Sequence, residues 1–491
     1  MRKRLGFALA VAMIIAIVFS AFATIEIYKP FSAPSKKPFY VGVTYCGDSV
    51  AEAKQLIDRV KNYTNLFVLD SGTLMTNVPL TEQICDYAIN AGLNVILCYS
   101  NNNPIFTCDS LITIAQTRWG SHFLGLYYDD EPGGKMLDSY ANLYSSNQNE
   151  TISKGRDGSL YVQTNNQITN SSTLYDYLPS GEIEVDISQN LPNSLEFHST
   201  FYYLNGTITY TTKNWSTTNE TLTSQILTYQ PDGTVQTDTG TVVTDAGNIS
   251  QFETYQELWD SKPIQTYAQA ANSFVSYEQS TLGSISNKSN VKLFTSDYDL
   301  DWFDYQGGYD VVLGQLGWNQ STTQNIALVR GAADMQDKSW GAMITWGSLS
   351  APYLQSGSQM YSEMKQAYES GAEYVVVFNF APDIDSTAGL LQDQQYSALQ
   401  SFWTDVVQNS SETNNVKGQD AFVLPNDYGW GMRNPDDNIW GMWHDNSSQQ
   451  VWSALQVSLI QYESKLDIVY EDPAYPTAGR YQHVYYWNQT T

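Results

Sequence analysis

The sequence predicts an α/β fold: a (β/α)8 TIM-type barrel with an antiparallel β-rich insertion after its fourth strand and a small C-terminal α/β appendage. Short apolar runs alternate with amphipathic helical segments, this rhythm breaks for about a hundred residues, and it resumes until eight strand positions are filled. Eight parallel strands are the number that closes this type of barrel. A doubly wound open sheet is the structural alternative.

The first half of the predicted barrel spans residues 39–135. The helical segments place apolar residues on one face, as at Ala51, Ile57 and Val60, and Gly92 ends the second helix as a C-cap. Strand–helix repeats of this kind form right-handed parallel units. In chain order the expected elements are strand Tyr40–Tyr45, helix Ser49–Lys61, strand Leu66–Leu69, helix Thr81–Ala91, strand Asn94–Tyr99, helix Leu111–Arg118 and strand Phe123–Tyr128.

The rhythm breaks over residues 136–250, which are rich in Ser, Thr and Asn. Alternating patterns predict strands at Thr207–Thr212 and Leu222–Tyr229. The turn sequence Pro231-Asp232-Gly233 then joins the second of these to Thr234–Thr239 as a hairpin. We therefore expect an inserted antiparallel lobe.

The second half of the barrel is expected over residues 251–411. Its weakest unit is the helix between Thr295 and Val311, where the sequence is rich in Asp, Gly and Tyr. The expected elements are helix Thr254–Gln279, strand Val291–Thr295, strand Val311–Leu316, helix Thr323–Gln336, strand Gly341–Trp346, helix Gln359–Ser370, strand Tyr374–Phe380 and helix Ala398–Gln408.

Residues 412–491 form the predicted appendage. Strand Ala421–Leu424, helix Gln450–Tyr462 and strand Leu466–Tyr470 make a strand–helix–strand unit. A Trp-rich loop, Asp427–His444, separates its first strand from its helix.

The N-terminus predicts export. Residues 1–24 begin with Arg2, Lys3 and Arg4 and continue without charge from Leu5 to Thr24, which is typical of a signal anchor or a signal peptide. The length of the apolar run favours an anchor, whereas the small residues of Ala21-Phe22-Ala23 suit cleavage. Residues 25–38 read as a linker. The positive-inside rule places everything after them outside the cytoplasm, either membrane-anchored or secreted.

Other features agree with an extracellular glycoprotein. Four cysteines, Cys46, Cys85, Cys98 and Cys108, allow up to two disulfides in three pairings. Sequons for N-glycosylation occur at Asn62, Asn149, Asn170, Asn205, Asn214, Asn219, Asn248, Asn287, Asn319, Asn409, Asn446 and Asn488. The formal net charge of -27 argues against nucleic acid and anionic lipid surfaces as partners. It favours a neutral or weakly charged ligand.

The clearest chemical signal follows the fourth predicted strand, where Asp129, Asp130 and Glu131 precede Pro132. Active sites of this fold lie at the C-terminal ends of the strands. Three adjacent acids repel one another, and this repulsion raises the pKa of one of them toward that of a general acid working at neutral pH.

Asp130-Glu131-Pro132 resembles the Asn-Glu-Pro of the fourth strand in clan-A glycoside hydrolases. The resemblance implies that Glu131 is the acid/base. The sequence departs from that family in having Asp at position 130, and the seventh strand ends in Ile344-Thr345-Trp346-Gly347-Ser348, without the glutamate nucleophile of the family.

The second carboxylate that hydrolysis needs must therefore come from another position in the sequence. Asp297 and Asp299 follow the fifth predicted strand and are candidates for the base of an inverting mechanism. Alternatively, Asp130 and Glu131 resemble the Asp-Glu pair of substrate-assisted N-acetylhexosaminidases, in which Asp130 would orient the acetamido group. The spacing of Asp297, Asp299 and Asp301 also fits a weak calcium-loop pattern. We nonetheless predict no metal and no cofactor, since the four histidines are scattered.

Further residues at strand ends are predicted to contact a glycan or polysaccharide. Tryptophans there offer flat rings on which sugars stack, and polar side chains there can bind hydroxyls. These candidates are Tyr45, Asp70, Asp129, Trp302, Trp318, Trp346 and Asn379. The functional hypothesis is an extracytoplasmic glycoside hydrolase with Glu131 as general acid. The alternative is a non-catalytic carbohydrate-binding or structural envelope glycoprotein on the same barrel.

Overall fold

The computed structural model describes residues 38–491 except for short segments, which are 100–104, 139–142, 145–149, 155–157, 167–168, 192–193, 217–220, 232–233, 238–248, 262–265, 287–290, 319, 349–351, 381–388, 410–416 and 489–491. The predicted signal anchor or peptide and all of the linker before Pro38 lie outside this part. Within it, we find no helix that is both long and apolar enough to span a membrane.

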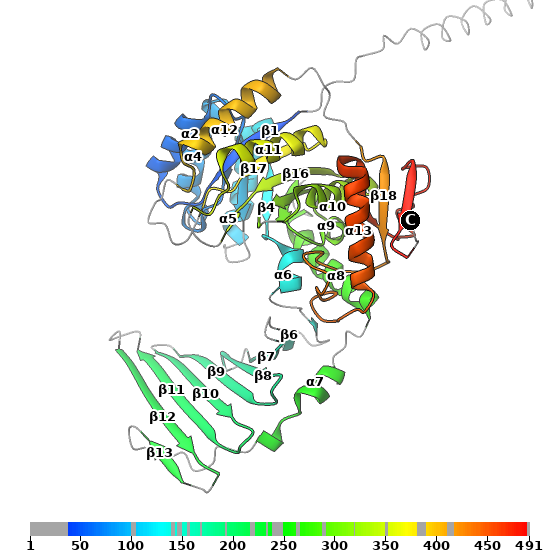
Figure 1. The fold of residues 1–491 in the computed structure, drawn as a ribbon. Helices are drawn as coiled ribbons and strands as arrows, with labels where there is room; N and C mark the ends of the chain where they lie inside the picture. The colour runs from blue at the N-terminus through cyan, green and yellow to red at the C-terminus, as the bar shows by residue number, and fades with distance from the viewer. Residues whose placement is uncertain are drawn as a thin grey trace, which may run out of the picture.

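Eight parallel strands close into a barrel, which confirms the predicted fold class (Figure 1). Around the barrel the strands follow the order β1-β17-β16-β15-β14-β4-β3-β2. Their bounds are β1 Tyr40–Tyr45, β2 Leu66–Leu69, β3 Asn94–Tyr99, β4 Phe123–Tyr128, β14 Leu293–Asp297, β15 Val311–Leu316, β16 Ser339–Ile344 and β17 Tyr374–Val377.

Helices cover the outside of the barrel. Serine side chains begin several of them: Ser321 accepts a hydrogen bond from the Gln324 amide at the start of α10, a typical N-cap. The predicted helix Thr254–Gln279 is two helices, α7 and α8, with Pro263 between them in the sequence. The helices are α2 Val50–Val60, α3 Gly72–Met75, α4 Val78–Asn90, α5 Ile105–Ile114, α6 Pro132–Asp138, α7 Tyr255–Ser261, α8 Tyr267–Ser286, α9 Asp301–Gly307, α10 Thr322–Met335, α11 Gly357–Glu369 and α12 Asp393–Phe402.

A nine-stranded antiparallel sheet is inserted between α6 and α7 and extends away from the barrel (Figure 1). The predicted hairpin is present, because β12 pairs antiparallel with β13. Side chains at one end of its strands, such as Tyr177, Ile183 and Tyr202, are buried, and Tyr202 packs against Phe252 in the segment before α7. The strands are β5 Leu143–Tyr144, β6 Glu150–Lys154, β7 Leu160–Asn166, β8 Ser171–Tyr177, β9 Ile183–Leu191, β10 Ser194–Tyr202, β11 Ile208–Ser216, β12 Thr221–Tyr229 and β13 Val235–Thr237.

The appendage packs against α8, α9 and α10 on the side of the barrel (Figure 1). It contains β18 Asp420–Leu424, α13 Ser448–Tyr462, β19 Leu466–Tyr470 and β20 His483–Tyr486, with β18 central in a parallel sheet. The sequence did not predict β20. Arg330 of α10 is 1 % exposed and forms an ion pair of 2.6 Å with Asp467 of β19, whose side chain is fully buried. This pair fixes the appendage to the barrel.

The cysteines correct one prediction. Cys46, Cys85 and Cys98 are free thiols, so none of the pairings among these three occurs. The side chain of Cys108 lies outside the described part of the chain.

Candidate active site at the barrel mouth

The inward-facing side chains of the barrel change from apolar to polar toward the C-terminal ends of the strands. Inward-facing positions nearer the N-terminal ends of the strands, among them Val68 and Leu313, belong to an apolar interior cluster. Because side chains alternate along a strand, the next inward positions are Asp70 after Val68 and Gln315 after Leu313. The polar layer thus formed consists of Thr44, Cys46, Asp70, Cys98, Tyr127, Ser296, Gln315 and Thr345. It forms the floor of the mouth, where active sites of this fold lie.

The backbone at the mouth is strained. Asp129, Glu131 and Trp318 have positive φ values of 51°, 54° and 52°, a region that non-glycine residues rarely occupy. The segment is held by its neighbours: the Thr295 hydroxyl donates to the Asp129 carbonyl at 2.7 Å, and the Glu131 amide donates to the Ser296 carbonyl at 3.0 Å. Strain that the surrounding structure maintains in this way clusters at functional sites.

Glu131 is half-buried at the mouth, as the fourth-strand pattern predicts. The Gln315 side-chain amide donates to its Oε1 at 2.7 Å. Burial, followed by the charge of Asp130, raises the pKa of Glu131, whereas the Gln315 hydrogen bond lowers it. The net effect is a raised pKa, which favours a protonated carboxyl able to donate.

Asp130 is exposed beside Glu131, and its carboxylate is bound by side chains of the barrel interior. The Tyr127 hydroxyl donates to its Oδ1, and the Ser296 hydroxyl contacts the same oxygen at 3.2 Å. Ser296 also lies 3.1 Å from the Gln315 amide, so one hydroxyl connects the supports of both acids. The two carboxyl groups therefore have fixed positions at the same opening.

Asp70 completes a group of three carboxyls. The Cys46 thiol lies 3.7 Å from its Oδ2. Burial, and then the negative charge of Asp130, raise the pKa of Asp70 to about 6, while hydrogen bonds from Cys98 and Cys46 lower it. Asp70 therefore lies near Asp130, and its role in binding substrate stays a prediction.

Two of the predicted tryptophans meet at the mouth. The rings of Trp318 and Trp346 have centroids 5.8 Å apart in an edge-on arrangement, and both side chains are half-buried. The indole nitrogen of Trp346 donates to the Phe380 carbonyl at 2.7 Å. Together they form one aromatic wall beside Glu131, since Trp318 also contacts Gln315 at 3.4 Å.

Three other predicted contacts are structural instead. Trp302 is 2 % exposed and packs against Tyr470 of the appendage, so it offers no face to a sugar. Tyr45 is 1 % exposed, and its hydroxyl donates to the Ser49 carbonyl at the start of α2. The Asn379 side-chain carbonyl accepts hydrogen bonds from the amides of Leu390 and Leu391, at 2.6 and 3.0 Å, which fixes a loop.

Asp297, a predicted candidate base, is fully buried and points to the helix layer. Its Oδ2 accepts from the Gly133 amide at 2.6 Å, and its Oδ1 accepts from the Gly134 and Tyr298 amides at 2.9 and 2.8 Å. Burial, and then the charge of Glu131, raise its pKa to about 7. Asp297 thus positions the backbone that follows Glu131 and is inaccessible to a substrate.

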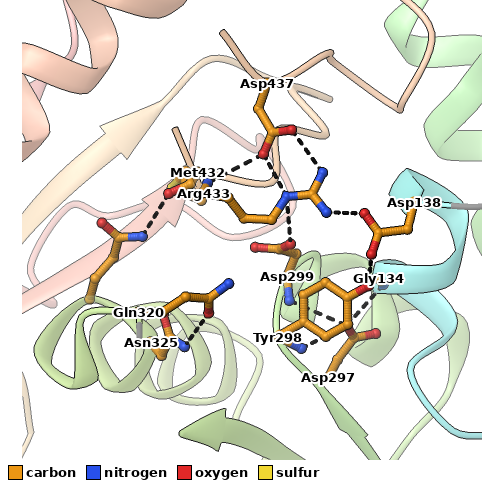
Figure 2. Close-up of polar contacts among 11 residues, drawn as sticks. Gly134, Asp138, Asp297, Tyr298, Asp299, Gln320, Asn325, Met432, Arg433 and Asp437 are labelled. Carbon is orange, nitrogen blue, oxygen red and sulfur yellow. Dashed lines mark hydrogen bonds and ion pairs between the residues drawn. The ribbon is translucent and has the colours of Figure 1, made fainter. Parts of the chain in front are cut away.

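Asp299 belongs to an ionic network that joins the mouth to the appendage (Figure 2). It is 2 % exposed and lies 3.8 Å from Arg433, which also pairs with Asp437 at 2.7 Å and with Asp138 of α6. The Tyr298 hydroxyl donates to Asp138 at 2.5 Å. Asp299 is therefore not a candidate base.

Asp129 lies on the other side of the strand-4 exit, toward α8. Its charge is the second cause, after burial, that raises the pKa of Glu278 of α8 to about 8. Burial raises the pKa of Asp129 itself. The third acid of the fourth-strand exit thus interacts mainly with the helix layer, while Asp130 and Glu131 line the opening.

A substitution at Gly134 tests the packing of its backbone against the ring of Tyr298. A Cβ at Gly134 would lie 2.2 Å from the ring of Tyr298, so we expect Gly134→Ala to lower the free energy of unfolding by about 1–3 kcal/mol, as overpacking does. Urea denaturation measures the change. Gly72→Ala is the matched control, because a Cβ there meets nothing within 4 Å. Equal stability of both variants would contradict the packing described for Tyr298.

Among the described residues, no group of histidine, cysteine and acidic side chains has the geometry to hold a metal ion. Compared with known protein families and with curated proteins, the chain matches none.

Proposed function

We propose that this protein hydrolyses glycosidic bonds of an extracytoplasmic glycan that binds in the barrel mouth, with Glu131 as the general acid. The observation that carries the proposal is a half-buried carboxyl with a raised pKa at the C-terminal face of the barrel. Such a group holds its proton at neutral pH better than an ordinary glutamate, and glycoside hydrolysis needs that proton for the leaving oxygen.

Asp130 is the proposed second carboxylate, because Asp297 and Asp299 are buried and already bonded. Glu131 gives its proton to the leaving oxygen as the glycosidic C–O bond breaks. A water molecule supplies the oxygen that bonds to the anomeric carbon, and its proton passes to Asp130. If the sugar carries an acetamido group, Asp130 orients that group, whose carbonyl oxygen bonds to the anomeric carbon as the leaving group departs. Water then replaces that oxygen at the anomeric carbon and gives its proton back to Glu131. A retaining mechanism with two glutamates lacks its second acid here, since Thr345 and Trp346 occupy the end of the seventh strand.

The aromatic wall of Trp318 and Trp346 supports a sugar as the ligand, because flat rings beside acids stack on the apolar face of a pyranose. Export is proposed from the N-terminal sequence. Among the described sequon asparagines, Asn214 is half-buried and donates to Glu196 at 3.0 Å, whereas the others are exposed, as glycosylation requires: Asn62, Asn170, Asn205, Asn409, Asn446 and Asn488.

A hydrolysis screen tests the proposal. The purified protein is incubated with neutral and N-acetylated oligosaccharides and with aryl glycosides, and the release of reducing ends or phenol is measured. We expect turnover on at least one of these substrates. Saturable binding at the mouth without turnover would contradict the catalytic proposal and favour the carbohydrate-binding alternative.

The pH dependence gives a second expectation. A general acid must be protonated, so activity falls as the pH rises through the raised pKa of Glu131. Gln315 and Lys135 both lower that pKa. Gln315→Leu and Lys135→Gln should therefore move the alkaline limb of the kcat/KM profile to higher pH. A limb that stays in place or moves to lower pH in both variants would exclude Glu131 as the titrating acid.

A further inference from the structure

A cavity opens at the end of the barrel opposite the mouth, where the strands begin. Its volume is about 360 Å³. Tyr40, Phe123 and Tyr374 line it and are the first residues of β1, β4 and β17, while Lys292 immediately precedes β14. This end of a (β/α)8 barrel ordinarily serves stability, not catalysis, so a cavity of this size calls for a separate explanation.

One side of the cavity is aromatic. The rings of Tyr40 and Tyr374 are stacked, with centroids 5.2 Å apart and planes 14° from parallel. Phe294 meets Tyr374 edge-on at 5.2 Å and fixes the inner ring of this pair. Tyr40 is half-buried, whereas Tyr374 is 2 % exposed. The cavity therefore has a rigid flat wall.

Polar groups without partners line the same cavity. Among the described residues, the hydroxyls of Tyr40 and Tyr374, the Lys292 ammonium and the Gln116 amide form no hydrogen bond or ion pair with another side chain. Lys292 and Gln116 are exposed, so these groups can exchange bound water for hydrogen bonds to a ligand. Glu373 adds an acceptor at the rim, where it also binds the Ser339 hydroxyl at 2.9 Å.

We propose that this cavity is a non-catalytic binding site for a neutral sugar unit. A pyranose offers an apolar face for the tyrosine wall and hydroxyls for the surrounding donors and acceptors. The single Lys292 and the single Glu373 balance in charge, which favours an uncharged ligand. The proposal rests on the cavity alone and holds whether or not Glu131 is catalytic.

Titration calorimetry of the full-length protein with methyl pyranosides, neutral disaccharides and glucuronate tests the proposal. We expect saturable binding of a neutral sugar. Tyr40→Ala should weaken it about tenfold, because the exposed ring is lost. Tyr374→Phe keeps the ring in the core and should weaken binding severalfold through loss of the hydroxyl. Trp318→Ala, at the mouth, should leave this binding unchanged, and Tyr40→Ala should leave any hydrolysis unchanged.

The outcomes separate the two ends of the barrel. If Trp318→Ala removes all sugar binding and Tyr40→Ala weakens none of it, the sugar binds at the mouth alone and the proposal is overturned. The proposal also fails if no neutral sugar binds, or if glucuronate binds best and Lys292→Gln abolishes its binding.

Discussion

Glu131→Gln should lower kcat/KM for glycoside hydrolysis by about 100- to 10,000-fold, the contribution typical of a positioned general acid. The substitution keeps the size of the side chain. It also keeps an acceptor for the Gln315 amide, which donates to Oε1 at 2.7 Å in the native protein. Folding should therefore be preserved, and the loss reports on the missing proton.

Steady-state kinetics on aryl glycosides with different leaving groups make this result specific. Loss of the general acid lowers kcat/KM most for substrates with poor leaving groups, because good leaving groups depart without a proton. Glu369→Gln is the matched control, since Glu369 is an exposed residue of α11 that pairs with Lys365 at 3.6 Å. Wild-type turnover by Glu131→Gln would remove Glu131 from the mechanism.

Arg330→Met should lower the free energy of unfolding by about 3–5 kcal/mol, because it leaves the carboxylate of Asp467 buried without its partner. Arg330 also donates to the Ser464 and Leu466 carbonyls, at 2.8 and 2.9 Å, so its loss loosens the contact between α10 and β19. Denaturant unfolding measures the effect.

Two further variants test whether the unpaired buried charge causes this loss of stability. Arg330→Met combined with Asp467→Leu should recover part of the lost stability, because the unpaired charge is gone. Lys365→Met removes an exposed pair of 3.6 Å and should cost no more than about 1 kcal/mol. Equal losses from Arg330→Met and Lys365→Met would show that the buried pair contributes little.

The barrel strands were predictable because each is a short apolar run between turns, and a barrel of parallel strands is buried on both faces. That same burial hides which residues face inward. In β14, Ser296 points into the barrel and Asp297 points to the helices, yet the run Leu293–Asp297 shows no alternation that would tell them apart. The sequence therefore could not show that the side chain of Asp297 is buried toward the helices.

The positions of Glu131 and Asp130 were predictable because both residues follow a strand end, which places their side chains near the mouth. Gln315 and Tyr127 were missed, since neutral polar residues within an apolar run carry no charge signal. Trp302 was misplaced because the sequence did not reveal which face of the barrel the appendage covers. Arg433, which is distant from the barrel in sequence, was missed for the same reason.

The parallel direction of all eight strands gives the molecule a front and a back. Pro38, the first described residue, lines the cavity at the back, where the strands begin. The carboxyls Asp70, Asp130 and Glu131 open at its front. If the N-terminal segment anchors the protein, the attached end of the barrel is the one that carries Tyr40 and Tyr374. The acids of the mouth then lie at the opposite end, one barrel length from the point of attachment.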